Sequence, residues 1–209
     1  MKKFAIAAVL AASSFFSAHA AAISGLVNTG SFASGAQDTH YKLNNDSYGY
    51  VSYDNFWPVG PWIANSATSK WITPTANQGA SLDPLVNGTY SWTLSFDLSG
   101  YNANTASFSA RFAADNSAIV KLNGTTIGSA NSFASFASFA ASSGFNSGLN
   151  TLEFVVTNDR QSSGNPTGLR VEFLQSTVAA VPEPETYAML LAGLGLVGMI
   201  GRRRMQRRA

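Results

Sequence analysis

Side chains that could do chemistry are few in this 209-residue chain, and they are scattered. There is no cysteine, so thiol chemistry and disulfides are excluded. Behind a predicted signal peptide, His40 is the one histidine, and any Ser-His-Asp nucleophile or histidine metal site would have to include it. A single histidine in a loop is usually only solvated. We therefore predict a protein that is not an enzyme and that holds no cofactor and no metal.

Carboxylates and amides offer two further possibilities. The carboxylates could supply the acid and base of a glycoside hydrolase, but no motif pairs them. Asn44-Asn45-Asp46 and Asp115-Asn116 could offer oxygen ligands to Ca²⁺, although their spacing matches no calcium-binding loop. Asn and Asp are common in turns, which is the more economical interpretation.

Sugar binding is the sharper hypothesis. Trp57, Trp62 and Trp71 lie in segments interrupted by prolines, which favours loops or edge strands. Exposed indole rings there could stack on pyranose rings, with Asp115 and Asn116 as candidate partners for the sugar hydroxyls. The alternative is that the tryptophans are buried and close the ends of the fold.

The elements that must position these residues are β-strands. Apolar and polar residues alternate with a period of two in several short segments, as in strands with one buried face. Asn123-Gly124 between two of them is a strong hairpin signal, because both residues tolerate positive φ. The sequence predicts an all-β fold, an antiparallel β-sandwich or jelly roll. The expected strands include residues 90–98, 106–113, 118–122, 125–127, 152–157 and 169–173.

One low-complexity segment, residues 132–140, interrupts this pattern. Its phenylalanines, Phe133, Phe136 and Phe139, are spaced by three, which suits neither a strand nor a long helix. We predict a connecting segment that tucks its rings into the core, with a binding surface as the alternative.

The first 20 residues have the features of a secretory signal peptide. Lys2 and Lys3 precede an apolar run, and Ala18-His19-Ala20 fits the small-x-small pattern of a signal-peptidase site. We predict cleavage after Ala20, which leaves a β-sandwich domain at residues 21–180. An N-terminal membrane anchor is disfavoured because the apolar run is short.

Residues 181–209 have three parts. Val181-Pro182-Glu183-Pro184-Glu185 is expected to be extended and outside any sheet or helix. As a short apolar helix, residues 187–200 would rise roughly 20 Å, less than the ~30 Å hydrocarbon core, so this helix could span only with snorkelling or local thinning. Five arginines follow and are predicted to stay in the cytoplasm: Arg202, Arg203, Arg204, Arg207 and Arg208.

The basic character of the chain belongs to its two ends. The whole chain has a formal net charge of +2, whereas residues 21–181 contain six basic and nine acidic residues, a net charge of −3. This balance gives no support for nucleic-acid binding, which needs a basic patch on the folded body.

The order of the three C-terminal parts resembles the PEP-CTERM sorting signal of Gram-negative bacteria. This resemblance implies recognition by an exosortase-type processing enzyme and removal of the tail near the Pro-Glu-Pro motif. It also implies delivery to the cell surface or extracellular matrix, with membrane contact only through the C-terminal segment before processing. The family is tied to bacteria that make exopolysaccharide, so extracellular polysaccharide is the implied partner. An ordinary C-terminal anchor that is never cut is the alternative.

A second resemblance spans residues 92–173. Motifs there follow one another as in the galactose-binding-like jelly rolls of surface and carbohydrate-associated proteins, and they include Phe112-Ala-Ala-Asp115-Asn116, Leu122-Asn123-Gly124 and Val156-Thr-Asn158-Asp159. The resemblance implies the fold, and no ligand set is carried over. The predicted function is an exported surface or matrix protein that associates with exopolysaccharide. The alternatives are a secreted hydrolase of that polysaccharide and a purely structural matrix protein without a ligand.

Overall fold

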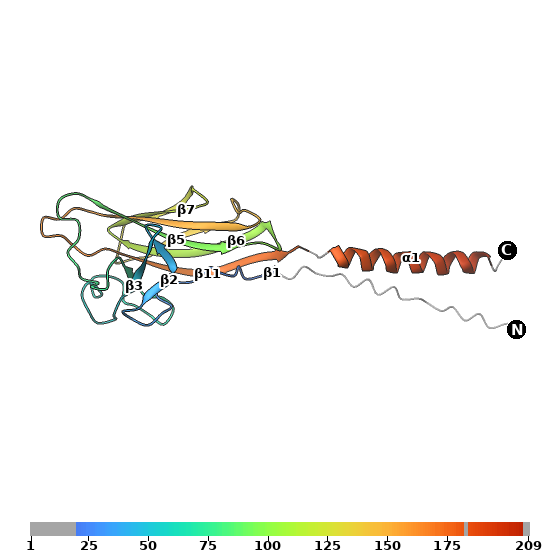
Figure 1. Cartoon of the computed structure of the whole chain (residues 1–209), viewed down its shortest axis with the longest axis horizontal. Helices are drawn as coiled ribbons and strands as arrows, with labels where there is room; N and C mark the ends of the chain where they lie inside the picture. The colour runs from blue at the N-terminus through green and yellow to red at the C-terminus, as the bar shows by residue number, and fades with distance from the viewer. Residues whose placement is uncertain (1–19, 182–183, 207–209) are drawn as a thin grey trace.

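The computed structural model describes residues 20–181 and 184–206 (Figure 1). The described strands pair antiparallel along one continuous path, in the order β8-β7-β10-β5-β2-β3-β4-β11-β6-β9, and β1 pairs with β11. The prediction of an all-β antiparallel fold is confirmed. The strands are β1 (Ala20–Ala21), β2 (Gln37–Leu43), β3 (Ser47–Val51), β4 (Ile72–Thr73), β5 (Gly88–Asp97), β6 (Tyr101–Asp115), β7 (Ser117–Leu122), β8 (Thr125–Ala130), β9 (Ala137–Ala141), β10 (Leu149–Asn158) and β11 (Gly168–Ala180).

The path of strands folds over on itself into two layers, and the core lies between them (Figure 1). The inward side chains of the period-two pattern meet there, many of them phenylalanines. Phe154 on β10 packs edge-on against Phe112 on β6 at 5.7 Å and against Phe139 on β9 at 5.8 Å between ring centroids. Each buried ring of this kind stabilises the fold by roughly 1.5–3 kcal/mol through removal of apolar surface from water.

The two ends of the strand path approach each other. A Cβ placed on Gly128 of β8 would lie 2.8 Å from Phe139 Cβ of β9, closer than real Cβ contacts. Only a residue without a side chain allows this approach. The absence of a side chain at Gly128 therefore lets the β8 and β9 ends of the sandwich pack tightly.

Two hairpin turns follow the sequence signals. Asn123 and Gly124 between β7 and β8 have φ of 48° and 87°, and Asn44 and Asn45 between β2 and β3 have φ of 51° and 69°. Consecutive residues with positive φ are typical of tight hairpin turns. Asn44-Asn45-Asp46 is therefore a turn, as predicted. In the described part of the chain, no group of three or more His, Cys, Asp or Glu side chains could hold a metal ion.

The expectation that the Phe-Ala-Ser segment contains no strand was wrong for residues 137–141. They form β9, in which Phe139 points into the core while Ser138 and Ala140 are exposed. Phe133 and Phe136 lie in a loop, whereas Phe139 lies in the strand. Their even spacing of three residues therefore concealed the period of two within β9. Phe133 and Phe136 pack against a second apolar cluster, so the prediction of tucked rings is confirmed.

The expectation for the proline-containing segment was partly wrong. Helix α1 (Pro184–Gln206) already includes Pro184 and Glu185, because proline is tolerated at the first helical position, where its missing N–H would be unpaired anyway. Val181 N donates to Gly100 O at 3.0 Å, which extends the sheet up to this point. Pro182, Glu183, Arg207 and Arg208 lie outside the described residues, as does the predicted signal peptide up to residue 19.

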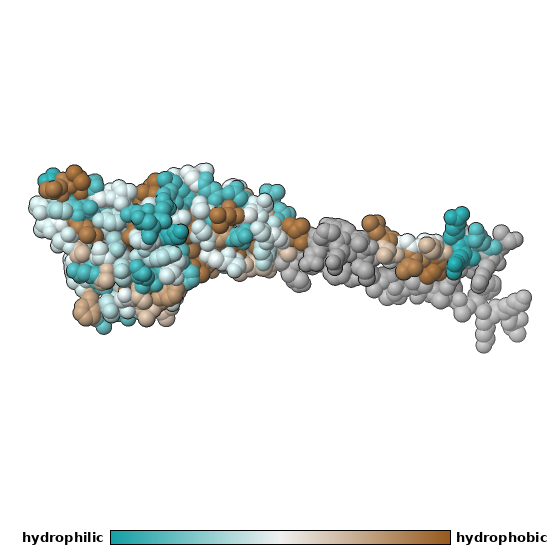
Figure 2. Space-filling view, viewed as in Figure 1, coloured by the Kyte–Doolittle hydropathy of each residue, from teal (hydrophilic) through white to brown (hydrophobic). Residues whose placement is uncertain are grey.

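Helix α1 continues beyond the end of the sandwich (Figure 1). Its side chains from Leu191 to Ile200 are exposed, and exposed Arg202 and Arg203 follow them. Figure 2 shows this change along the helix from brown to teal. Among the helices of the described residues, none is long and apolar enough to cross a membrane.

Candidate functional site

Strand register places the candidate site far from the C-terminal helix. Strand β11 begins at Gly168, which pairs with Asp115 at the end of β6, and it ends at Ala180, which pairs with Tyr101. Thirteen residues of strand, at about 3.3 Å each, separate these two ends by roughly 40 Å. We call the end of the sandwich next to Gly168 and Asp115 the distal end.

A hollow of about 190 Å³ opens at the distal end. Four of the five predicted sugar-binding residues line it, which are Trp57, Trp62, Asp115 and Asn116. The structure thus brings together residues that are far apart in sequence. The remaining lining residues are Pro58, Pro61, Phe133, Gln161, Asn165 and Pro166.

Trp57 is the exposed aromatic residue of this hollow. Its side chain is 62% exposed, and it also lines a second hollow of about 430 Å³ together with Tyr53, Phe56 and Gln78. Trp57 is therefore a ridge between the two hollows. Tyr53 and Phe56, which the sequence analysis did not select, are exposed as well and meet edge-on at 5.7 Å. The signal that could have found Phe56 is its place beside Trp57 in the same proline-interrupted segment.

Gln78 fixes the backbone that carries these rings. Its buried amide Nε2 donates to Phe56 O at 2.9 Å and to Trp57 O at 3.2 Å, and its Oε1 accepts from Tyr53 N at 2.6 Å. Gly79 lies against the indole, since a Cβ there would be 3.2 Å from Trp57 Cδ1. The backbone of the aromatic ridge is thus held in place, which would lower the entropic cost of binding a ligand there.

Trp62 and Trp71 are buried, with exposures of 2% and 0%, and their ring centroids are 4.4 Å apart. They pack with Val59 and Ala113 in a cluster beneath the distal loops. Neither ring can stack on a sugar, so the alternative interpretation, that tryptophans close the end of the fold, holds for these two. Trp57 is left as the stacking candidate among the three predicted tryptophans.

Asp115 forms part of the floor of the first hollow. Its side chain is 5% exposed, its Oδ2 accepts from Trp62 Nε1 at 2.8 Å, and its Oδ1 has no partner within the described residues. Burial raises the pKa of Asp115 to about 6; the hydrogen bond from Trp62 opposes this, and the charge of Asp159 adds to it. At neutral pH the hollow therefore carries one buried negative charge.

The amide side chains at the hollow differ in whether they already bond to other parts of the protein. Asn116 Oδ1 accepts from Asp159 N at 2.7 Å, and buried Asn165 donates to Asp159 O at 2.9 Å, so both hold the loop after β10. Gln161 is exposed on the rim. We expect Gln161, which the sequence analysis did not select, to be the amide most available to a ligand.

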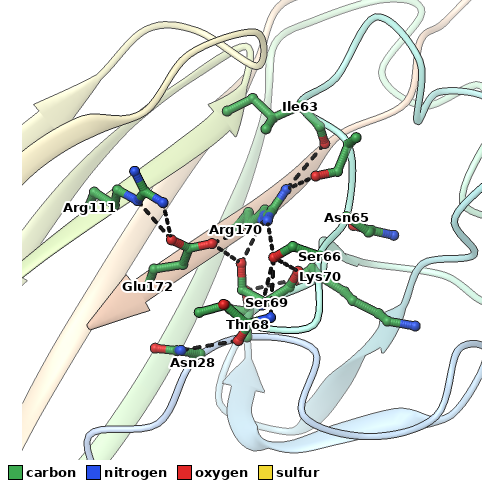
Figure 3. Close-up of polar contacts among 12 residues, drawn as sticks. Asn28, Ile63, Asn65, Ser66, Thr68, Ser69, Lys70, Arg111, Arg170 and Glu172 are labelled. Carbon is green, nitrogen blue, oxygen red and sulfur yellow. Dashed lines mark hydrogen bonds and ion pairs between the residues drawn. The ribbon is translucent and has the colours of Figure 1, made fainter. Parts of the chain in front are cut away.

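Arg170 supports the loop at residues 63–70, which carries Trp71 at its C-terminal side (Figure 3). Its guanidinium donates to Ile63 O at 3.3 Å, to Ala64 O, to Ser66 Oγ at 3.0 Å and to Ser69 Oγ at 2.6 Å. It also pairs with Glu172 at 3.2 Å. Arg170 thereby fixes the loop at residues 63–70, which leads into the buried Trp71.

The period of two in residues 169–173 predicts Arg170 and Glu172 on the polar face of a half-buried strand, and the structure corrects this. Both residues are buried. The polar face of β11 is covered here by the loop at residues 63–70, and buried charges persist only when they are paired and hydrogen-bonded. Phe136 also covers them, with its ring centroid 5.1 Å from the Arg170 guanidinium carbon.

His40 does meet a serine and an aspartate, but not in a catalytic geometry. Ser31 Oγ lies 3.1 Å and Asp38 Oδ1 lies 3.2 Å from the same ring atom, His40 Nδ1. A Ser-His-Asp nucleophile needs the hydroxyl and the carboxylate on opposite ring nitrogens. Buried Asp38 instead accepts from Gly30 N at 2.7 Å, so this cluster fixes a loop.

These features define an antiparallel β-sandwich with a hollow at its distal end and a C-terminal helix at the other end. The chain carries a PEP-CTERM protein-sorting motif at residues 180–204, which confirms the first resemblance. No curated protein matches the chain.

Three solved structures are similar to part of this chain. A PA14 sugar-binding domain from an RTX adhesin is 17% identical with a TM-score of 0.27, covering 46% of this chain and 56% of its own. A family 35 carbohydrate-binding module from an environmental isolate is 14% identical with a TM-score of 0.26, and the match covers 50% of this chain and 79% of the module. The CBM36-1 domain of a multidomain xylanase from the hindgut metagenome of Trinervitermes trinervoides is 12% identical with a TM-score of 0.28, and the match covers 79% of this chain and 98% of that domain. Likeness at this level carries no functional argument.

Proposed function

We propose that the chain is exported, sorted by an exosortase-type enzyme after transient membrane anchoring, and displayed at the cell surface or in the extracellular matrix of a Gram-negative bacterium. There it associates with extracellular polysaccharide through the distal end of the sandwich. The single observation that carries the binding role is Trp57, an exposed and pre-positioned indole between two hollows. Flat aromatic faces beside amides and a carboxylate suit the apolar faces and hydroxyls of pyranose rings.

The distal position supports the same role. Because β11 runs from the hollow to the sorting segment, the hollow is presented roughly 40 Å away from the membrane-proximal end. A polymer outside the cell could therefore reach Trp57 while the C-terminal segment is still in the membrane.

A polysaccharide hydrolase is the weaker candidate. Acid-base cleavage of a glycosidic bond uses two carboxyl groups. Among the described residues that line the two hollows, Asp115 is the one carboxylic acid. The arrangement favours binding without cleavage.

Replacing Trp57 with alanine is expected to weaken binding of the host exopolysaccharide by at least about tenfold, because the stacking face would be lost. Since Trp57 is mostly exposed, the melting temperature should change by no more than about 2 °C. Calorimetric titration and thermal unfolding of the exported protein check the two parts. Leu85→Ala is the matched control, an exposed apolar side chain that lines neither hollow, and should bind normally. Equal affinities for Trp57→Ala and the unmodified protein would refute the proposed site; self-association without any glycan binding would favour the purely structural protein.

The mass of the exported protein tests the processing steps. We expect it to begin at Ala21 and to lack the arginines from Arg202 onward. Cleavage after Ala20 would remove the pairing of Ala20 with Ala179 and keep that of Ala21 with Val178. A surface-released protein that still ends in Arg208-Ala209 would show that the tail is an uncut anchor.

A further inference from the structure

We infer that the ligand of the distal end is an uncharged stretch of at least two sugar residues lying across Trp57, with one residue in each hollow, and that polyuronic acid chains are disfavoured. This inference rests on the proposed function and adds the length and the charge of the ligand.

The length follows from the two hollows that share Trp57. The hollow above Asp115 measures about 190 Å³, below the roughly 300–1,000 Å³ typical of small-molecule sites. A ligand confined to it would leave much of its surface in water. A chain that continues past Trp57 enters the second hollow of about 430 Å³, where Tyr53 and Phe56 extend the aromatic surface. The structure thus offers one continuous surface to a chain and little to a single sugar.

The rigidity of the ridge supports the same length. Gln78 ties the carbonyls of Phe56 and Trp57 and the amide of Tyr53 to one buried side chain, so the backbone of the ridge residue Trp57 and of the two aromatic residues of the second hollow is positioned together. A ligand that contacts both hollows gains from this shared preorganisation, because no loop has to be ordered on binding.

The charge follows from the lining residues. No lysine or arginine is among the described residues that line either hollow, and the one ionisable acid is Asp115, whose Oδ1 is unpaired. Asp159 adds a second negative charge nearby. Arg160, which precedes the rim residue Gln161 in sequence, directs its Nε to Pro84 O, and Lys70 pairs with Asp54. A uronate carboxylate on the order of 6 Å from Asp115 would be repelled enough to lose about tenfold in affinity at an intermediate dielectric.

Matched oligosaccharides test both features on the exported protein. The probes are neutral glucose, mannose and galactose oligomers of one to six residues, and the same oligomers oxidised at C6 to uronates, titrated by calorimetry at pH 7. We expect affinity to rise at least tenfold from the monosaccharide to the trisaccharide and then to level off. We expect each uronate to bind about tenfold more weakly than its neutral parent, and Asp115→Asn to narrow that difference to within about threefold by removing the repulsion.

The outcomes separate the inference from the proposed function. A monosaccharide that binds as tightly as its oligomers would overturn the length, and uronates that bind as well as neutral chains would overturn the charge, while both would leave glycan binding at Trp57 intact. An unchanged preference in Asp115→Asn would also overturn the charge argument. The absence of binding to every neutral and oxidised oligomer, with no effect of Trp57→Ala on binding to the host polysaccharide, would overturn the proposed function itself.

Discussion

Replacing Arg170 with methionine is expected to lower the free energy of unfolding by about 3–5 kcal/mol, because it breaks a buried ion pair and leaves its partner behind. Arg170 is 2% exposed, and its guanidinium satisfies Glu172, two serine hydroxyls and two backbone carbonyls. Methionine fills similar space but donates no hydrogen bond, so these acceptors lose their donor in a buried place.

The partner left behind is Glu172. Burial alone would raise the pKa of Glu172, but hydrogen bonds from Ser69 and Arg111 and the two guanidinium charges hold it below its usual value. Desolvation lowers the pKa of Arg170, and the charge of Glu172 opposes that change. The carboxylate therefore depends on its cations to remain ionised in the folded protein, and removal of the buried one is costly.

Two variants separate the buried pair from general loss of charge. Arg111 bonds the same carboxylate at 2.6 Å and stacks on the same Phe136 ring, yet its side chain is 43% exposed. Arg111→Met should therefore cost only about 1 kcal/mol. The double variant Arg170→Met, Glu172→Met removes both buried charges and should regain part of the loss. Urea unfolding followed by tryptophan fluorescence measures all three, and equal losses in the two single variants would contradict the role given to burial.

The sequence pattern predicts the strands far better than it predicts what covers them. The period of two in residues 90–98 and 152–157 identifies β5 and β10, because each face of a strand is read from local neighbours alone. The same reading fails for Arg170 and Glu172. Arg170 is covered by a loop 101 to 107 residues away in sequence, and no local period reports so distant a contact.

The candidate site shows the same limit within one short segment. Trp57 and Trp62 share the proline-interrupted context that predicts loop tryptophans, yet one is exposed and the other is buried. The difference in exposure depends on a residue that is distant in sequence: Asp115, at the end of β6, accepts the Trp62 indole N–H and holds that ring inward. No local pattern in the sequence predicts this hydrogen bond. The residue types nevertheless indicated Asp115, Trp57 and Trp62 as candidates, and these three residues meet at the hollow.

Asp115 should make the stability of the protein fall as pH rises from about 4 to about 7. The pKa of Asp115 is raised from 3.8 to about 6 in the folded protein, so in this range the folded state binds more protons than the unfolded state. Stability from this group is fully present below pH 4 and is lost as pH rises through the folded pKa of about 6. The loss amounts to about 3 kcal/mol at neutral pH.

Comparison of Asp115→Asn with the unmodified protein isolates this effect. An asparagine can still accept from Trp62, but its amide hydrogens would occupy the place of the unpaired Oδ1 at some fixed cost. That cost does not vary with pH and cancels in the change of the stability difference, which should favour the variant by about 2 kcal/mol more at pH 7 than at pH 4. Urea unfolding at a series of pH values measures the difference.

Asp159→Asn supplies the control for this curve. The charge of Asp159 is the smaller of the two causes that raise the pKa of Asp115, after burial, so its removal should weaken the pH dependence without abolishing it. If the stability difference between Asp115→Asn and the unmodified protein stayed flat from pH 4 to pH 7, Asp115 would have to be ionised as readily when folded as when unfolded. The floor of the hollow would then be solvated, and the repulsion of uronates by the still ionised Asp115 would be screened and weaker. The stability curve therefore tests, without any ligand, the buried charge on which the expected sugar preference depends.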